Sequence, residues 1–292
     1  LNFIYKSKGT EKSFRNLIRC YGIDEEVIKL NAYGNNSTFK FEDTYSDATV
    51  RKNYIDFNHP DRFDGIVYQR PSSNSETTGI SYISGTNANF ANTAEAEIIF
   101  PKKMDFSNKQ YFLTPFVSAS LFGTHTAKAS ATDFGWVTTG NDYGLQAYFV
   151  KTAEEAKDGH FVLKNRAGTI NLTSSVFADV YDNQKWNLAV RVKDGKYPYA
   201  SGVTGSDDSN NVTVEFVGYN IELGVTRNEF SVSATGLRDN YLTARRRYYA
   251  GADRTNTLGA AVTKTDVRVS SVRHYAHYLE DSVLLAHAKD PT

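Results

Sequence analysis

The chain has 292 residues and balances 33 lysines and arginines against 33 aspartates and glutamates, so its formal net charge at pH 7 is zero. Its length suffices for one large domain or two ordinary ones, with a core that needs no disulfide or metal for support. The zero charge argues against a nucleic-acid-binding protein, whose affinity rests on many cationic contacts to phosphate, and it gives no reason to propose an anionic membrane surface.

The residue types favour β-structure. The chain contains 19 Tyr and 18 Phe, which fit the pleated and half-buried surface of a sheet. Cys20 is the single cysteine, which excludes an internal disulfide framework. We find neither a signal peptide nor a run of about 18 apolar residues, so we expect no membrane span. Met104 is the single methionine, so we expect the chain to be a segment of a longer polypeptide.

Residues 1–34 are predicted to form a small helix–strand module. Thr10 can cap a helix, Gly22 can end it, and apolar residues recur between them at the spacing of one helix face. This pattern predicts an amphipathic helix over residues 11–21, followed by a strand over residues 27–33 that ends at Gly34. A helix and a strand of this size cannot bury a core alone, so we expect the module to dock on another protein. The predicted docking residues are Phe14, Leu17, Ile18 and Tyr21.

Residues 35–92 are predicted to be a connector between two parts of the chain. They are rich in Asn, Ser, Thr, Asp and Gly, and include Pro60 and Pro71. Short strands are expected around residues 39–41 and 80–83. The predicted division is therefore a module at 1–34, a connector at 35–92 and a main domain at 93–292.

The main domain reads as a series of short apolar strands separated by Gly, Asn, Asp and Pro. The predicted strands cover residues 95–100, 112–122, 144–150, 160–164, 169–172, 186–192, 212–216, 230–233, 248–250 and 266–275. Strands at this spacing, without long helices between them, indicate an antiparallel sandwich or jelly roll. Alternation along one strand places Trp186, Leu188, Val190 and Val192 on the same face. A helix is predicted only after the last strand, over residues 280–288.

Three segments of this domain resemble the concanavalin A-like, laminin-G-like jelly-roll superfamily. Residues 185–192, KWNLAVRV, are similar to its central strand, which begins with tryptophan and alternates. Residues 249–252, YAGA, are similar to the strand before its final hairpin. Residues 266–275, followed by 279–284, resemble the strand and short helix that close such domains. The match implies buried side chains at Val267, Val269 and Val272 or their neighbours, and at Leu279, Leu284 and Leu285.

The N-terminal segment resembles a different family. Residues 5–19 contain a Lys8-Gly9-Thr10 turn that opens a helix, similar to an assembly module in tail and baseplate proteins of bacteriophages. Such a module stands upstream of a laminin-G-like domain in several large phage structural proteins. The resemblance implies a structural protein on the exterior of a phage particle, with other virion proteins as partners and a homo-oligomer as a further option.

The acidic residues do not show the pattern of a glycoside hydrolase. Such enzymes need two opposed carboxylates, which on one strand must stand two or four residues apart to share a face. Glu95 and Glu97 alternate correctly, but no further acid follows before Asp105. We therefore expect Glu95 and Glu97 to line the solvent-facing side of the first strand, and the chain to be no enzyme.

The sequence gives little support for a metal-binding site or a reactive cysteine. His274 and His277 are three residues apart, but no further ligand joins them at the spacing of a zinc site. Cys20 is expected to be a small buried hydrophobe on the amphipathic helix. No cofactor is implied, and Ca²⁺ is the one ion to consider, since laminin-G-like domains can bind it at the sandwich rim. The oxygen donors of such a site would be Asp133, Asn141 and Asp142, or Asp207 and Asp208, all of which can equally be turn residues.

Two surface roles remain open. The run Arg245-Arg246-Arg247 beside tyrosines could bind nucleic acid. The zero net charge favours instead a protein interface, or an edge strand whose charges discourage sheet-to-sheet aggregation. Loop aromatics could instead form a platform for a host-surface glycan, or pack in the sandwich or against a neighbouring subunit. The predicted glycan-binding residues are Trp136, Tyr143, Tyr197 and Tyr199, with Phe134 beside them.

These observations together predict a mainly β, antiparallel jelly-roll protein that serves as a non-enzymatic component of a phage virion. It would dock on other virion proteins through its N-terminal module, with glycan attachment through the sandwich loops as an additional role. The alternative is a carbohydrate-active enzyme or lectin built on the same jelly roll.

Overall fold

The computed structural model describes residues 2–23, 32–34, 37–39, 52–69, 91–102, 116–127, 136, 142–195, 197, 211–222, 224–244 and 246–289. The contacts divide the chain into two units, Leu1–Val50 and Arg51–Thr292. No helix within the described ranges has the length and apolar content needed to cross a membrane.

The N-terminal unit contains two short helices and a two-stranded hairpin. Helix α1 spans Asn2–Lys6 and helix α2 spans Glu11–Cys20, and the strands β1 (Ala32–Gly34) and β2 (Ser37–Phe39) pair antiparallel. Gly9 and Gly22 follow the two helices with positive φ angles, 85° and 77°, which glycine adopts without strain. The predicted helix is thus confirmed, whereas α1 was not predicted. Residues 27–31 of the predicted strand lie outside the described residues.

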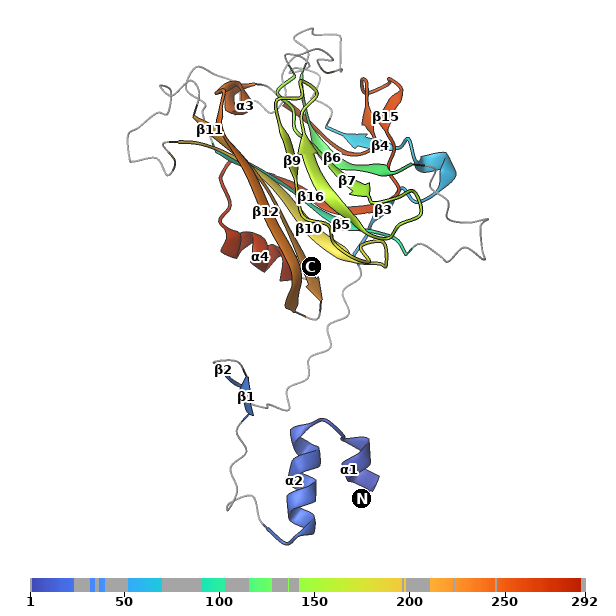
Figure 1. Ribbon diagram of the computed structural model, residues 1–292, viewed down its shortest axis with the longest axis vertical. Helices are drawn as coiled ribbons and strands as arrows, with labels where there is room; N and C mark the ends of the chain where they lie inside the picture. The colour runs from blue at the N-terminus through green and yellow to red at the C-terminus, as the bar shows by residue number, and fades with distance from the viewer. Residues whose placement is uncertain are drawn as a thin grey trace. The chain divides into compact units, whose positions relative to one another are not determined.

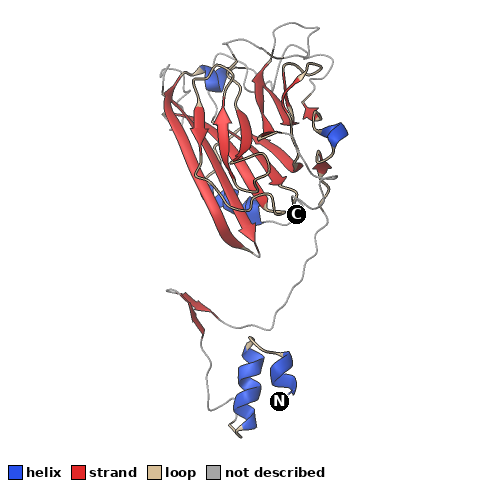
Figure 2. Cartoon of the chain, turned by 45° about the vertical axis from the view of Figure 1, so that its right-hand side comes forward, coloured by secondary structure: helices blue, strands red, loops and turns tan. Residues whose placement is uncertain are grey.

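The second unit is a sandwich of two antiparallel sheets, as predicted (Figure 1). In strand order the first sheet contains β12 (Val225–Leu237), β11 (Val212–Glu222), β10 (Lys185–Asp194), β5 (Asn92–Ile99), β16 (Arg268–Tyr275) and β3 (Ile55–Asp56). The second sheet contains β4 (Ile66–Tyr68), β13 (Arg246–Gly251), β6 (Ser118–Thr126), β7 (Gln146–Lys151), β8 (Gly159–Lys164) and β9 (Asn171–Thr173). Figure 2 shows these strands as two facing layers.

Smaller elements decorate the sandwich. Strands β14 (Asp253–Arg254) and β15 (Ala261–Thr263) form a separate hairpin after β13. A 3₁₀ turn, η1, spans Pro60–Arg62, and helix α3 spans Asn240–Thr243. Helix α4 spans Asp281–Lys289, which confirms the predicted C-terminal helix.

Each strand predicted beyond residue 93 has an observed counterpart, although several bounds differ. Strand β6 begins at Ser118 rather than at residue 112, and residues 103–115 lie outside the described residues. Strands β11 and β12 run well past the predicted 212–216 and 230–233, and the additional residues continue the antiparallel pairing between these two strands. The predicted strand at 80–83 lies outside the described residues, and β3, β4, β14 and β15 were not predicted.

Two of the unpredicted strands belong to the segment that we expected to be a connector. Strand β3 pairs with β16 and strand β4 pairs with β13, so each closes one edge of a sheet. The contacts place the division of the chain between Val50 and Arg51. The expected boundaries at 34/35 and 92/93 stay predictions about the organisation of domains.

The space between the sheets is filled largely by aromatic side chains. Phe161 stacks on Phe230 with ring centroids 4.9 Å apart, and Trp186 lies 4.7 Å from Phe161. The face predicted for β10 is confirmed, since Trp186, Leu188, Val190 and Val192 all belong to this core. Offset and edge-to-face ring pairs stabilise such a core beyond their buried area, which explains the chain's many Phe and Tyr residues.

Helix α4 covers the outer face of the first sheet. Leu279, Leu284 and Ala288 are buried there against Ala189 and Val217, and Leu285 packs beside them. This confirms that the predicted leucines fold back on the sheet. Helix α4 contacts β10 and β11, and Figure 1 shows it beside this sheet.

One of the core positions predicted near β16, Val272, is not buried in the structure. Val267 and Val269 are buried as expected, but Val272 is 45% exposed. A bulge between Ser270 and Arg273 shifts the pairing with β5, and Ser271 has a φ angle of 49°. A bulge inserts an extra residue into the strand, so the side chains beyond it exchange faces.

The basic run is also placed differently from the prediction. Arg246 and Arg247 begin β13, which lies between β4 and β6 and is therefore no edge strand. Both side chains are fully buried. The prediction of an edge-strand device is wrong for these two residues, and Arg245 lies outside the described residues.

Candidate functional site

One member of the predicted aromatic platform, Trp136, is enclosed in the fold. Trp136 is 0% exposed and donates a hydrogen bond from Nε1 to the Arg254 carbonyl at 3.1 Å, so the prediction is wrong for this residue. Tyr143 is half-buried against Tyr241, with ring centroids 5.5 Å apart, and Tyr197 lies 5.3 Å from the ring of Tyr278. Phe134 and Tyr199 lie outside the described residues. A glycan-binding role for Tyr143 and Tyr197 stays a prediction.

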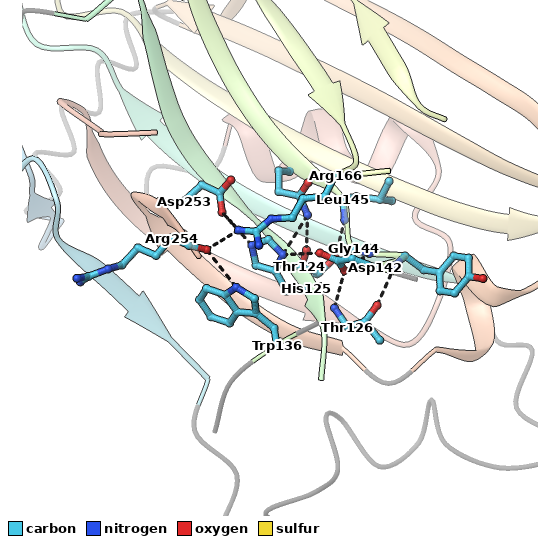
Figure 3. A network of polar contacts seen from close by, with 12 residues as sticks. Thr124, His125, Thr126, Trp136, Asp142, Gly144, Leu145, Arg166, Asp253 and Arg254 are labelled. Carbon is cyan, nitrogen blue, oxygen red and sulfur yellow. Dashed lines mark hydrogen bonds and ion pairs between the residues drawn. The ribbon is translucent and has the colours of Figure 1, made fainter. Parts of the chain in front are cut away.

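Trp136 instead covers a buried histidine that the sequence did not point to (Figure 3). His125 on β6 places Nδ1 2.9 Å from Asp142 Oδ2 and Nε2 3.0 Å from Asp253 Oδ1. Each ring nitrogen of His125 thus lies within hydrogen-bonding distance of a carboxylate oxygen. All three side chains are buried.

Aromatic rings close both faces of this imidazole. Trp136 stacks on His125 with centroids 4.5 Å apart and planes 18° from parallel, and Tyr249 stacks at 5.1 Å and 14°. Stacked aromatic rings at these separations pack favourably and keep water from the faces of the imidazole. With its edges bonded and its faces covered, His125 exposes no atom to a ligand.

Further donors hold the two carboxylates. Burial alone would raise the pKa of Asp142, but its hydrogen bond to His125 and the backbone N–H groups of Thr126 and Gly144 lower it below the usual value. Burial likewise opposes ionisation of Asp253. The hydrogen bond and charge of His125, then the charge of Arg166, lower the pKa of Asp253 nonetheless.

Asp142 was predicted as a calcium ligand, and its role in the structure is different. Its Oδ1 accepts hydrogen bonds from the backbone nitrogens of Thr126 at 2.8 Å and Gly144 at 2.9 Å, while Oδ2 bonds His125. Both oxygens are therefore engaged, and the ionised side chain fastens the turn before β7 to the end of β6. Asp133, Asn141, Asp207 and Asp208 lie outside the described residues. Within the described ranges, no group of three His, Cys, Asp or Glu residues is placed to hold a metal ion.

Gly144 is required by the close packing of this turn. A Cβ at this position would lie 2.1 Å from the Thr124 carbonyl oxygen and 2.8 Å from Asp142 Oδ1. Any other residue would therefore displace the strand or the carboxylate.

Glu95 and Glu97 do not lie on a solvent-facing surface, which corrects another prediction. Glu95 accepts a hydrogen bond from Asn187 at 2.7 Å and lies 2.9 Å from His287 Nδ1 on α4. Glu97 lies 2.8 Å from Lys52 Nζ. Both carboxylates are buried because α4 and the segment before β3 cover the outer face of β5. Burial and then the charge of Glu97 raise the pKa of Tyr54.

His274 and His277 do not combine into a metal site within the described residues. His274 is largely buried, with its ring 4.4 Å from that of Tyr248. Burial, and then the charge of Arg246, lower the pKa of His274 to about 4. This histidine is therefore uncharged at neutral pH.

A polar cavity of about 570 Å³ lies at one end of the sandwich and was not predicted. One wall is the turn before β10, and the other is the hairpin that joins β11 to β12. No motif marks it, because its walls lie far apart in the sequence. The lining residues are Asp179, Asp182, Asn183, Gln184, Lys185, Asn220, Ile221, Glu222, Arg227 and Asn228.

The N-terminal unit carries a third candidate, the apolar face of α2. Phe14 is 55%, Leu17 43% and Tyr21 77% exposed, and Ile18 is half-buried. Helix α2 has no buried residue at all. Cys20 is exposed, so the prediction of a buried cysteine is wrong.

Comparison with known proteins adds structural neighbours only. The chain matches no protein-family model, and no curated protein matches it. One similar structure is the full-length tailspike protein 2 from Escherichia coli O157:H7 bacteriophage CAB120, at a TM-score of 0.39 and 11% identity over 76% of this chain and 26% of that chain. This chain thus spans 26% of the tailspike's length.

Two further similar structures come from proteins named for carbohydrate chemistry. The PL-14 alginate lyase from Aplysia kurodai has a TM-score of 0.38 and 11% identity, over 76% of this chain and 80% of that chain. The CBM40 of the Ruminococcus gnavus IT-sialidase, bound to sialyllactose, has a TM-score of 0.34 and 10% identity, over 68% of this chain and 84% of that chain.

Proposed function

We propose that this chain is a non-enzymatic structural component of a bacteriophage particle, attached to other virion proteins through helix α2. The observation that carries the proposal is the exposure of Phe14, Leu17 and Tyr21 on a helix with no buried residue of its own. Exposed apolar side chains at helical spacing are typical of a protein interface. The resemblance of residues 5–19 to a phage assembly module gives this interface its expected setting.

The charges around this face define the partner. Residues 2–23 contain five cations against one anion, Glu11. Within α2, Arg15 lies at the border of the apolar face and forms an ion pair with Glu11, whereas Arg19 lies farther round the helix. The partner proposed here is a virion protein with an apolar groove flanked by acidic side chains. Such complementarity guides association and fixes the orientation of the helix.

The sandwich supports a role without catalysis. His125 has both nitrogens bonded to carboxylates and both faces covered by rings, so it presents no lone pair to a substrate. Glu95 and Glu97, the acids expected to face solvent, are buried and paired. A general base must come within hydrogen-bonding reach of the proton it removes, and these groups are closed off from bound molecules.

Incorporation into particles tests the attachment role. In the phage that encodes the chain, Phe14→Ser combined with Leu17→Ser removes the centre of the apolar face. The matched control combines Lys12→Ser with Asn16→Ser, on the opposite side of α2. We expect the first variant to be lost from purified particles by at least about tenfold, as judged by quantitative mass spectrometry, because truncated interface anchors typically cost 2 kcal/mol or more, roughly. Equal amounts of both variants in the particles would contradict the proposal.

Carbohydrate recognition is a second candidate function, and one observation favours it. The polar cavity at the end of the sandwich combines amide, carboxylate and cationic side chains in a volume of about 570 Å³. Ligand sites commonly measure about 300–1,000 Å³ and use a few converging polar groups to fix orientation. This role would belong to the sandwich and is independent of attachment through α2.

A further inference from the structure

We propose that the polar cavity between the β9–β10 connection and the β11–β12 hairpin binds a short, uncharged oligosaccharide. This inference rests on the carbohydrate-recognition role proposed above and assigns it a place and a ligand class. The place differs from the loop aromatics that the sequence suggested.

The first wall of the cavity is held rigidly by the core beneath it. Asn183 donates its backbone N–H to the Phe100 carbonyl at 3.0 Å, and the N–H of Phe100 is donated to the Gln184 carbonyl at 3.0 Å. The side chain of Gln184 accepts a hydrogen bond from Trp186 Nε1 at 3.1 Å. These bonds fix the wall before any ligand arrives, which reduces the entropy lost on binding.

The backbone of this wall is also unusual. Asp179 and Asn183 adopt φ angles of 54° and 63°, in the left-handed region that few residues other than glycine enter. Asp179 is held there by its N–H bond to Asp158 at 2.8 Å. Such positions persist where surrounding contacts determine them, and they are common at binding sites.

The second wall is formed where the β11–β12 ladder is irregular. A register shift between Asn220 and Ile221 interrupts the pairing with β12. Asn220 donates a hydrogen bond to the Lys185 carbonyl at 2.9 Å, which ties the two walls together, and accepts one from Asn228 at 3.3 Å. Bulges of this kind commonly redirect side chains beside functional sites.

The chemistry of the lining suits hydroxyl groups. A sugar hydroxyl both donates and accepts, and a side-chain amide offers a carbonyl oxygen and an NH₂ group to neighbouring hydroxyls. The amides of Gln184 and Asn220 are engaged within the protein. Asn183 accepts the Lys102 N–H through Oδ1 and Asn228 donates to Asn220 through Nδ2, so the NH₂ group of Asn183 and the carbonyl oxygen of Asn228 are the amide groups offered to a ligand. Ile221 supplies an apolar surface for the C–H face of a ring. A ligand that is polar over its whole surface and carries small apolar patches matches this combination.

The charges exclude a strongly anionic ligand. Three lining residues are acidic and two are basic. Asp182 is 2.8 Å from Lys102 and Glu222 is 2.9 Å from Arg227, so these charges are already paired. Lys185 lies 3.6 Å from buried Glu97. With its cations engaged and Asp179 added, the cavity offers no surplus positive charge to a phosphate, sialate or uronate group.

Binding of defined oligosaccharides to the full chain tests the inference. The neutral probes are maltohexaose, cellohexaose and chitohexaose, and the acidic probes are an oligogalacturonate and sialyllactose. We expect at least one neutral probe to bind, with Asn228→Ala and the double variant Glu222→Ala/Arg227→Ala each weakening it by about tenfold or more in isothermal titration calorimetry. Asn171→Ala, an exposed asparagine on β9 in the other sheet, is the matched control and should bind as the parent does.

Each other outcome is decisive. If a neutral probe binds equally well to the cavity variants and the parent, carbohydrate recognition stands and its placement in this cavity is overturned. If the acidic probes bind in preference, the proposed ligand class is wrong. If no probe binds, both the recognition role and this site are overturned. Thermal unfolding of each variant confirms that the sandwich is intact, since the Glu222–Arg227 pair is exposed and contributes little to stability.

Discussion

The two units of the chain differ in the exposure of their apolar side chains. In the sandwich, Phe161, Trp186 and Phe230 are enclosed between two sheets. In the N-terminal unit, Phe14 and Leu17 project from a helix that buries none of its residues. The sandwich therefore encloses its own apolar side chains, whereas α2 leaves its apolar face exposed, which is the basis for the docking role that we propose for it.

The difference follows from size and connectivity. A ten-residue helix is too short to be stable on its own in water, and a hairpin of three-residue strands adds little to it. The sandwich instead joins strands from both ends of the unit, and it can bury polar groups such as His125 and Asp253 because each finds a partner. Stability is concentrated in the sandwich, and attachment is assigned to the smaller unit.

The largest expected effect is on the buried charges of the sandwich. Asp253→Ala leaves His125 and Arg166 without the carboxylate that both contact, and removing one member of a buried pair typically costs about 3–5 kcal/mol. We expect the free energy of unfolding to fall by that amount in urea denaturation. Asp61→Ala, at an exposed position, is the control and should change it by less than about 0.5 kcal/mol. Equal stability of the two variants would show that the network contributes nothing.

A smaller loss is expected where α4 docks on the first sheet. Leu284 is fully buried, and a buried Leu→Ala change costs about 2–5 kcal/mol, depending on how far the site collapses. We expect about 3 kcal/mol for Leu284→Ala in the same urea experiment. Leu258→Ala, whose side chain is 90% exposed, is the matched control and should be close to neutral. A neutral Leu284→Ala would mean that α4 is not held on the sheet.

The third prediction concerns pH. The pKa of His274 is lowered to about 4 in the folded protein, against about 6.5 in the unfolded chain. The unfolded chain therefore binds a proton first as the pH falls, and the folded state loses roughly 2–3 kcal/mol between pH 6.5 and 4. We expect His274→Gln to remove this slope in pH-dependent unfolding. The lowered pKa values of Asp142 and Asp253 act in a separate window, since their contribution is complete above about pH 4 and is lost at lower pH.

An unchanged slope in His274→Gln would assign the pH dependence to another group.

The smallest effect is expected in the N-terminal unit. Gly22 ends α2 with a φ angle of 77°, where alanine is strained by about 1 kcal/mol. Gly22→Ala should speed amide hydrogen exchange in α2 and leave exchange in β10 unchanged, because the two elements belong to separate units. Gly168→Ala, at a turn with a φ angle of 72° in the sandwich, is the converse control. Faster exchange in both units after either change would show that the two units unfold together.

The strands could be predicted because their signals are local. Alternation from Trp186 to Val192 and the leucines after residue 278 specify which faces are buried, and both predictions are confirmed. The exposure of Val272 could not be predicted in this way, because a one-residue bulge reverses the faces without a residue type that marks it.

The buried polar groups could not be predicted because their partners are distant in the sequence. His125 and Asp253 are 128 residues apart, and only the pairing of β13 with β6 brings them together. Glu95 alternates like a solvent-facing residue, and it is buried because α4 returns over the sheet with His287. Arg246 and Arg247 resemble a surface cluster in the sequence, but both are buried at the start of β13, where they pair with β6. In each case, segments that are distant in the sequence bury the polar side chain, and the local sequence pattern gives no sign of them.

Deletion of residues 1–50 tests the central claim most directly, because it removes one unit and retains the other. In the phage that encodes the chain, the copy number of the shortened protein in purified particles is compared with that of the full chain, and thermal unfolding of the isolated protein is recorded alongside. The account predicts an unfolding midpoint like that of the full chain together with loss of the protein from particles. A shortened chain that unfolds normally and still enters particles at full copy number would contradict it.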